Sequence, residues 1–240
     1  DPRHFIGCTL LDPYDHWEKV DPRLATHHQV LSQAASAFGH DLVHQATYAH
    51  EILRRLPDRA ALEGADLVLV GSMTEAFLVS LRSAYDITAS PTAYVATGKP
   101  GQAPQNSLRT LAEWARKNPN RVKGPVRELL SAIPEEFWQL RSLRDHIVHR
   151  GADAIIHTDR KQFNLWIHGP TGWVTREPLL PFLARHHSAL LAFADRTGQL
   201  VHQMLQLPAD RIGSRIVEGV MIHSLHELRS IAPDYAARSP

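Results

Sequence analysis

The chain has 240 residues, of which 43% are hydrophobic, and this is enough to bury a substantial core. Its 26 basic and 25 acidic residues give a formal net charge of +1, which argues against a protein that coats nucleic acid by electrostatics alone. Cys8 is the only cysteine, so an intramolecular disulfide and a cysteine-rich zinc site are both excluded. We therefore expect a reducing, cytoplasmic location.

Neither a signal peptide nor a membrane span is predicted. The first residues, Asp1 to His4, lack a basic segment that is followed by an apolar one. The most apolar stretch, residues 67–79, is interrupted by Ser72, Thr74 and Glu75. We therefore expect no association with a membrane.

Helical periodicity covers most of the N-terminal half. Apolar and small residues recur at intervals of three and four over residues 22–56, which predicts a long helix. A second long helix is predicted over residues 60–89, with Asp58 as its cap, until Ser90 and Pro91 interrupt it. Residues 98–107 contain two prolines and two glycines, so we expect a mobile loop there, followed by a short helix at 108–117.

Prolines punctuate the next helices. Pro125 suits the first turn of a helix, and Pro134 should kink or restart it. Residues 135–150 then form another helix, for which Gly151 is a suitable C-terminal cap. This helix carries the segment Arg-Asp-His-Ile-Val-His, residues 144–149.

The character of the chain changes after residue 150. Between residues 154 and 176, β-branched and aromatic residues are separated by turn residues, which predicts a small β-hairpin or antiparallel meander. Two further helices are predicted near 179–205 and 210–231. The predicted fold is mainly α: a single domain over residues 1–240, built as an antiparallel helical bundle with this β insertion and with N- and C-terminal helical extensions.

Arg144 stands at an unusual position in its helix. On a helical wheel it falls within the apolar stripe centred near Leu140 and Ile147. A guanidinium cannot be neutralised by losing a proton, so an anion should meet it there. Glu75 or Asp86 on the preceding long helix could be that partner, or the side chain could reach solvent from the edge of the stripe.

Asp145 and His149 are spaced i, i+4, so their side chains can form a hydrogen bond that favours the imidazolium. An ordinary histidine that interacts with the helix dipole is the alternative. Arg144 and His149 lie about 140° apart on the wheel. Joint action therefore requires that the arginine wrap around the helix end, or that another helix or a second subunit complete the site.

Arg144, the polar Asp145, three further residues and His149 form an R-polar-x3-H pattern. This segment resembles the motif of HEPN domains (higher eukaryotes and prokaryotes nucleotide-binding). The resemblance covers the motif helix and, loosely, residues 60–206, but neither the N-terminal helix nor the region after Pro208. It implies a HEPN-like helical bundle and a symmetric homodimer, in which two motifs together form one RNA-cleaving cleft.

The resemblance also implies roles for individual residues. Arg144 would bind the scissile phosphate, and His149 would act as general base or acid. Asp145 would orient or tune the site, while His146 stands where the pattern allows variation. The RNA 2′-hydroxyl would attack, giving a 2′,3′-cyclic phosphate and a 5′-hydroxyl without a metal ion or another cofactor.

The expected partner is RNA, with transfer RNA as one candidate. The segment from Gln105 to Arg150 contains nine basic and five acidic residues, a local excess of positive charge. The candidates for RNA binding among them are Arg141, Arg150, Lys123 and Arg127. Three tryptophans could stack on bases, although core and hairpin packing is the more common reason for such residues: Trp138, Trp166 and Trp173. A cognate antitoxin or a regulatory protein would be a further partner in a toxin–antitoxin or phage-defence setting.

Two other functions stay open at this stage. One is a non-catalytic HEPN-like module that binds nucleotides, RNA or protein. The other is a metal-binding helical bundle, whose candidate ligands are His40, His44, His223, His226 and Glu227. Arg82 and Asp86 could also form a simple i, i+4 ion pair rather than part of a site.

Overall fold

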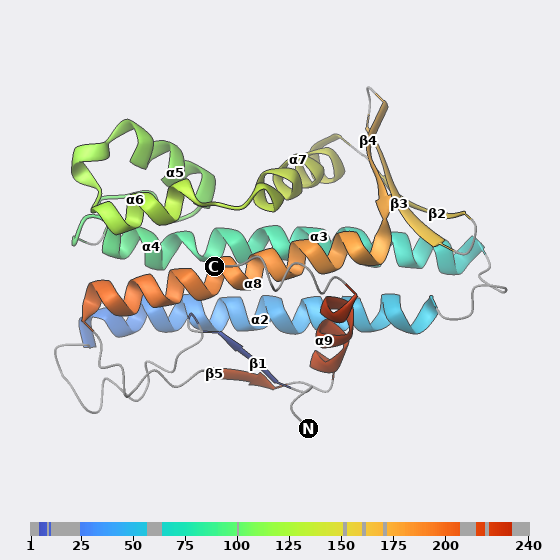
Figure 1. Ribbon diagram of the computed structural model, residues 1–240, viewed down its shortest axis with the longest axis horizontal. Helices are drawn as coiled ribbons and strands as arrows, with labels where there is room; N and C mark the ends of the chain where they lie inside the picture. Colours follow the sequence, from blue (N-terminus) through green and yellow to red (C-terminus); the bar gives the residue numbers. More distant parts are fainter. Residues whose placement is uncertain are drawn as a thin grey trace.

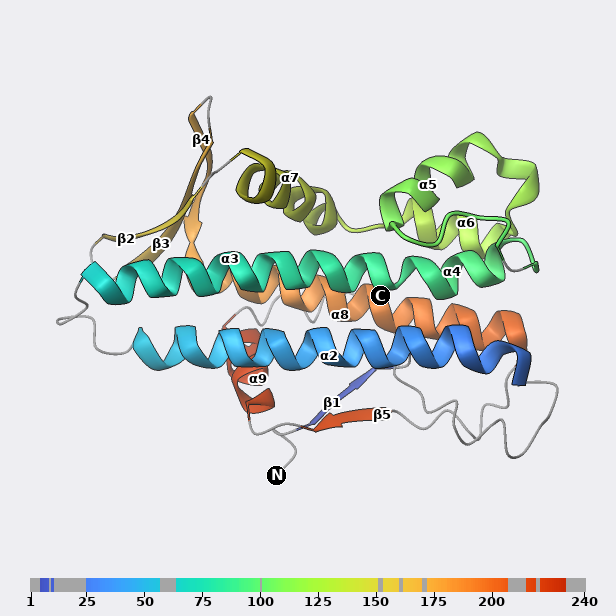
Figure 2. The same ribbon diagram turned by 180° about the vertical axis from the view of Figure 1, so that it is seen from behind.

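The computed structural model describes residues 5–8, 10, 25–56, 64–99, 101–150, 153–159, 162–169, 172–206, 215–218 and 221–231. These residues are mainly α-helical, with a small three-stranded antiparallel sheet, as predicted. Three long helices, α2 (Ala25–Arg55), α3 (Gly64–Ile87) and α8 (Leu179–Leu205), run side by side along the molecule (Figure 1). Seen from behind, α3 and the helix that follows it form the upper edge of this layer (Figure 2).

The long helices agree with the predicted ranges, but the role of Pro91 does not. The sequence predicted that Ser90 and Pro91 end a helix. Instead, α3 ends at Ile87, and a new helix, α4 (Ala89–Ala96), begins two residues later. Pro91 lies in the first turn of α4, where a missing N–H costs nothing, so the proline is compatible with a helix that restarts. The Thr88 side chain donates to the Tyr85 carbonyl at 2.6 Å across the break.

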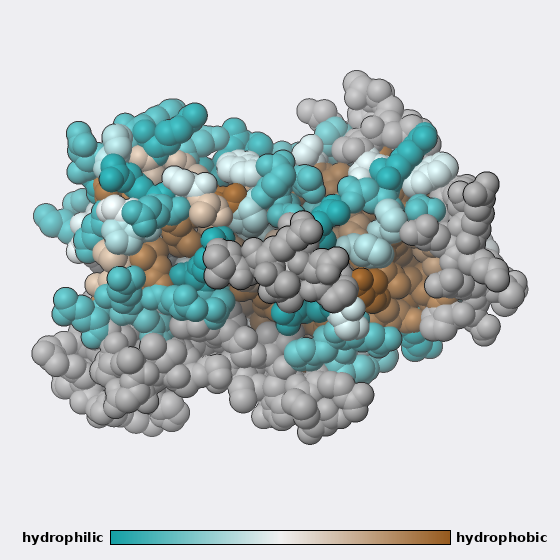
Figure 3. Space-filling view, in the orientation of Figure 1, coloured by the Kyte–Doolittle hydropathy of each residue, from teal (hydrophilic) through white to brown (hydrophobic). Residues whose placement is uncertain are grey.

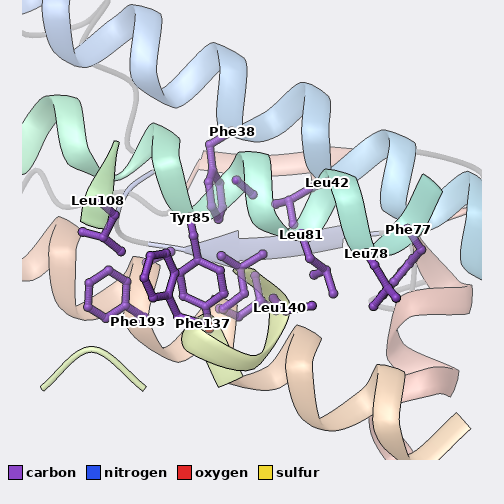
Figure 4. Packing of buried hydrophobic residues seen from close by; sticks show 14 of the residues in the cluster. Phe38, Leu42, Phe77, Leu78, Leu81, Tyr85, Leu108, Phe137, Leu140 and Phe193 are labelled. Carbon is purple, nitrogen blue, oxygen red and sulfur yellow. The ribbon is translucent and has the colours of Figure 1, made fainter. Parts of the chain in front are cut away.

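The core lies where α3 meets its neighbours. Figure 4 shows aromatic and aliphatic side chains of α3 meeting those of the neighbouring helices there. Tyr85 of α3 packs between two of them, with ring centroids 5.4 Å from Phe137 and 5.8 Å from Phe193. Each of these three side chains is essentially inaccessible to solvent. Burial of large aromatic rings contributes strongly to the free energy of folding, so this contact fixes α3 against both neighbouring helices.

A group of shorter helices covers the same face of the long layer. These are α5 (Leu108–Lys117), the 3₁₀ turn η4 (Pro119–Arg121), α6 (Gly124–Ser131) and α7 (Glu135–Arg150). Pro125 lies in the first turn of α6, and α7 begins directly after Pro134, as predicted. Residues 101–107 form no helix or strand, as expected, although Ala103 is buried. Gly151, the predicted cap of α7, lies outside the described residues.

The meander follows α7 and consists of β2 (Asp153–Asp159), β3 (Gln162–Gly169) and β4 (Gly172–Pro178) in the order β2-β3-β4. All pairs are antiparallel, with Ile155 opposite Trp166 and Trp166 opposite Arg176. The sheet packs tightly on α3: a Cβ placed on Gly71 would lie 2.5 Å from the Ala154 carbonyl oxygen. Only glycine allows the strand to approach the helix so closely.

The C-terminal region contains a strand where a helix was predicted. Within the predicted range 210–231, β5 (Arg215–Glu218) precedes α9 (Ile222–Ser230). This strand pairs antiparallel with β1 (Phe5–Cys8), where Ile6 lies opposite Val217. The prediction was wrong for this segment because the β-branched pair Ile216 and Val217 also fits a strand, and the partner strand lies two hundred residues earlier.

The segment Gly64–Ala96, which comprises α3 and α4, is long and apolar enough to cross a membrane, with a mean hydropathy of 1.4 over 18 of its residues. Core helices have the same length and composition. In the fold, this segment packs against α2, α7 and α8. Figure 3 shows hydrophilic residues over α5 and α6, with apolar residues between them and the lower helices.

Candidate active site

The R-polar-x3-H residues lie in the last two turns of α7. The Nη1 atom of Arg144 lies 2.9 Å from Nε2 of His149, five residues further along the helix. Arginine only donates hydrogen bonds, so Nε2 must accept, which places the proton of a neutral imidazole on Nδ1. Of the solutions that the wheel left open, a long arginine that wraps around the helix end is therefore the one found.

Asp145 is held by two arginines. Its Oδ1 atom accepts from Arg144 Nη1 at 3.3 Å, and its Oδ2 atom lies 3.7 Å from Arg141 Nη2. The expected hydrogen bond between Asp145 and His149 is not found among the described residues. Arg144 instead contacts both side chains, because its long stem reaches past the i, i+4 position. Asp145 therefore orients the arginine rather than the imidazole.

A groove of about 450 Å³ opens beside these residues, between α3, α5 and α7. Its lining residues come from all three helices and are mostly polar: Val79, Arg82, Ser83, Asp86, Ser107, Arg109, Thr110, Arg141, Arg144 and Asp145. Four guanidinium groups lie in this groove together with two carboxylates. A further carboxylate, that of Glu113, pairs with Arg109 at 2.5 Å. The balance leaves a positive excess that suits a single phosphodiester.

Asp86 supports the groove without touching Arg144. Its Oδ2 atom lies 2.5 Å from Nη1 of Arg82, as the i, i+4 spacing predicted. Its Oδ1 atom accepts a hydrogen bond from the backbone N–H of Leu108, the first residue of α5, at 2.9 Å. The Arg82 guanidinium also lies 4.5 Å from the centre of the Phe137 ring. Asp86 therefore ties α5 to α3 and neutralises a largely buried arginine.

Glu75 has a different role from the one proposed for it. Its Oε1 atom accepts a hydrogen bond from the backbone N–H of Ala154 at 2.7 Å, so it holds β2 against α3. It lines another groove, between α2 and α3, together with Ile147. Neither Glu75 nor Asp86 pairs with Arg144 within the described part of the chain. The expectation that one of them holds Arg144 was wrong, because Asp145 on the same helix is closer.

The other predicted residues divide between several surfaces. His146 Nδ1 donates to the carbonyl of Ser142 at 2.7 Å, one turn back in the same helix. Arg141 shares the groove with Arg144, whereas Arg127 lines a separate groove beside Trp138. Lys123 is exposed at the start of α6. The side chain of Arg150 lies outside the described residues.

Two of the three tryptophans have described side chains. Trp138 packs against Phe137, with ring centroids 4.7 Å apart. The Arg176 guanidinium lies 4.9 Å from the ring centre of Trp166 on β3. The side chain of Trp173 lies outside the described residues. Trp138 also lines a groove, whereas the Trp166 ring is partly covered by an arginine.

The candidate metal ligands do not gather in the described regions. Across residues 25–56 and 221–231, as elsewhere in the described chain, no three histidine, cysteine, aspartate or glutamate side chains lie close enough together to hold one ion. His223 instead packs edge-on against His50, with ring centroids 5.7 Å apart. His50 in turn shares a hydrogen bond of 3.2 Å with Ser224.

The sequence did not single out the contribution of α5. Ser107 caps this helix by accepting from the Thr110 N–H at 3.5 Å, and Ser107, Arg109 and Thr110 line the groove. The serine before the predicted helix 108–117 was the available signal, since N-terminal turns of helices favour anions. Its position beside Arg144 depends on contacts across the fold that the sequence does not reveal.

Comparison of the chain with protein families, with curated proteins and with solved structures finds no match.

Proposed function

We propose that the protein is a metal-independent endoribonuclease of the HEPN type, with a HEPN-like fold. The observation that carries this proposal is the 2.9 Å contact between Arg144 and His149. It joins a phosphate-binding group to an acid–base group at the edge of an arginine-lined groove. General acid–base catalysis and stabilisation of phosphoryl charge can together promote phosphodiester cleavage without a metal ion.

Arg144 and His149 would act together on one phosphate. The Arg144 side chain is 36% exposed, and His149 is exposed at the end of α7, so a ligand can reach both. When a phosphate binds, the guanidinium would turn its two-pronged donor face from Nε2 of His149 to the phosphate oxygens. This movement frees the lone pair on Nε2, which is then available to accept a proton.

The reaction would begin when Nε2 of His149 removes the proton from a ribose 2′-hydroxyl. The 2′-oxygen forms a bond to phosphorus, and the bond from phosphorus to the 5′-oxygen breaks. The leaving 5′-oxygen takes a proton from an acid, for which the protonated His149 of a second subunit is our candidate. The products are a 2′,3′-cyclic phosphate and a 5′-hydroxyl, and the arginine stabilises the charge that grows on the phosphoryl oxygens.

A homodimer would supply this second histidine. The motif lies at the accessible end of α7, where Val148 is 48% exposed beside His149. An apolar residue at this place suits an interface around a two-fold axis. We propose RNA, with transfer RNA as one candidate, as the substrate of a cytoplasmic enzyme, and a cognate antitoxin or regulatory protein as a further partner.

Binding without cleavage is the second candidate function. Asp145 and Asp86 pair with arginines of the groove, and the remaining positive charge still suits a phosphate whether or not His149 takes part. Such a protein would bind nucleotides or RNA and leave the RNA intact. The two candidates are separated by the chemistry of His149 alone.

The test is incubation of the purified protein with total transfer RNA in excess EDTA. Arg144→Ala and His149→Ala should each lower the cleavage rate by about a hundredfold or more. Arg54→Ala and His40→Ala, which remove exposed side chains from α2, are matched controls and should cleave at the full rate. RNA that stays intact with the unchanged protein would overturn the ribonuclease proposal in favour of binding alone.

A further inference from the structure

A second groove, of about 530 Å³, is lined by residues of α5, α6 and the motif helix α7. Its floor is apolar and is formed by Ala112, Ala115, Leu130 and Trp138. Its rim is polar and contains Arg116 of α5 and Arg127 of α6. A concave apolar surface of this volume with a few charged groups at its edge is the usual form of a small-ligand site.

Trp138 offers this groove a flat aromatic surface. The side chain is half-buried, and its ring plane lies at 79° to that of Phe137, so Phe137 does not stack flat upon it. Within the described chain, no acceptor takes a hydrogen bond from its indole N–H. A flat ring with an unused donor, open to a groove, is suited to stacking with a planar heterocycle.

The two arginines at the rim are available to an anionic ligand. Among the described residues, neither Arg116 nor Arg127 forms an ion pair, and Arg127 donates only to the carbonyl of Pro119, at 3.4 Å. The carboxylate in this groove, Glu113, is already paired with Arg109. Two unneutralised guanidinium groups beside an aromatic ring match the two parts of a nucleotide, its phosphate and its base.

This groove adjoins the proposed cleavage site. The ion pair between Arg109 and Glu113 stands between them, since Arg109 lines the first groove and Glu113 lines the second. On α7, Trp138 and Arg141 are three residues apart and therefore neighbours on one face of the helix. A chain of nucleotides that passes over the ion pair would connect Trp138 with Arg144.

We propose that the second groove binds one nucleotide of single-stranded RNA near the scissile phosphate, with its base on Trp138 and a phosphate between Arg116 and Arg127. This assignment rests on the proposed function and gives it a preference for unpaired RNA. A base within a duplex is stacked between its neighbours, so it cannot lie on Trp138.

The test measures binding of a fluorescein-labelled, unstructured 12-nucleotide RNA by anisotropy, with His149→Ala as the background so that cleavage does not interfere. Trp138→Ala should weaken binding about tenfold, whereas Trp138→Phe, which keeps a stacking ring, should stay within about threefold of the background protein. Trp166→Ala on β3 is the matched aromatic control and should bind normally. The double variant Arg116→Ala/Arg127→Ala, on the exposed rim, should reduce the salt slope of log K by about 1.4.

The outcomes separate this proposal from the ribonuclease itself. Unchanged affinity and salt slope in all these variants, or equally tight binding of a duplex, would overturn the groove assignment while leaving cleavage by Arg144 and His149 intact. If binding depends on Trp138 but the unchanged protein cleaves no RNA, the groove assignment is supported and the ribonuclease proposal is overturned. RNA that does not bind at all would overturn both.

Discussion

Asp86 caps α5 from another helix: its carboxylate accepts the N–H of Leu108 at 2.9 Å, across 22 residues of sequence. The same carboxylate pairs with Arg82, whose side chain is only 9% exposed. One residue therefore satisfies a helix terminus and a largely buried charge, and both of these groups border the groove that contains Arg144.

Replacement of Asp86 by alanine should lower the free energy of unfolding by about 2 kcal/mol, because it removes a cap and leaves a buried guanidinium without its partner. Asp86→Asn should recover part of this loss, since the amide oxygen can still accept from Leu108. Glu128→Ala, which removes an exposed carboxylate from α6, is the control. Urea denaturation measures all three, and equal midpoints for Asp86→Ala and the control would contradict the double role.

Gly71→Ala should destabilise the protein even though alanine favours helices. The new Cβ would lie 2.5 Å from the backbone carbonyl oxygen of Ala154. Neither atom belongs to a flexible side chain, so the helix or the strand would have to shift. We expect a net loss of about 1–3 kcal/mol in the free energy of unfolding, which exceeds the gain in helix propensity. Gly64→Ala, at the start of the same helix, meets nothing within 4 Å and should be neutral or slightly stabilising. A stabilised Gly71→Ala variant in urea denaturation would disprove the close packing.

Two adjacent histidines of α8 should make folding sensitive to acid. Burial lowers the pKa of His187 to about 3 and that of His186 to about 4, from an ordinary value of 6.5. Within the described chain, neither ring nitrogen of His187 has a hydrogen-bond partner. The unfolded chain takes up protons below pH 6.5 while the folded one does not, so stability is complete above that pH and falls as the pH is lowered towards 4.

The size of this effect should be on the order of 2 kcal/mol per histidine between pH 6.5 and 4.5. His187→Phe removes one titrating group and should make the fall shallower, whereas His40→Phe on the exposed face of α2 should leave it unchanged. Urea unfolding at several pH values in this window measures the slope. Most carboxylates titrate below the window, so they add little to it. Equal slopes for the His187 variant and the parent would rule out a buried neutral imidazole.

Mixing the parent protein with an inactive variant tests whether the proposed site is shared between subunits. In the proposed mechanism the base is His149 of one chain and the acid is His149 of the other, so a mixed dimer with one His149→Ala chain lacks one of the two groups. The parent and this variant, unfolded together in equal amounts and refolded, should therefore cleave at about a quarter of the rate of the same total amount of refolded parent protein. Each protein refolded alone provides the baseline. A rate of about half, despite mass evidence of mixed dimers, would assign cleavage to groups from a single chain and remove the dimer from the mechanism.

Much of the helical framework follows from the sequence because periodicity and proline positions are local signals. The spacing of apolar residues predicted α2 and α8, and Pro125 and Pro134 marked the starts of α6 and α7. Pro91 misled the prediction because a proline in a first turn and a proline after a last turn give the same local signal. The strand β5 was missed because its partner, β1, is distant in sequence.

The site was predictable only in part, for a related reason. A wheel gives the direction in which a side chain leaves the helix, but not the reach of an arginine, so the contact from Arg144 to His149 stood as one option among several. The partner of Glu75 is a backbone N–H on a strand, which no pattern of side chains indicates. The approach of α5 to α3 depends on Asp86, whose capping role spans two helices.

Helix ends usually unwind more readily than helix centres, and a reactive group in a last turn would then sample many positions. In this protein the strand β2 begins three residues after α7 ends, and Glu75 and Gly71 hold that strand against α3. The chain is thus held to α3 both by α7 itself and by the strand that follows it. These two attachments limit how far the last turn of α7 can unwind, so the imidazole should stay near the groove between encounters with substrate.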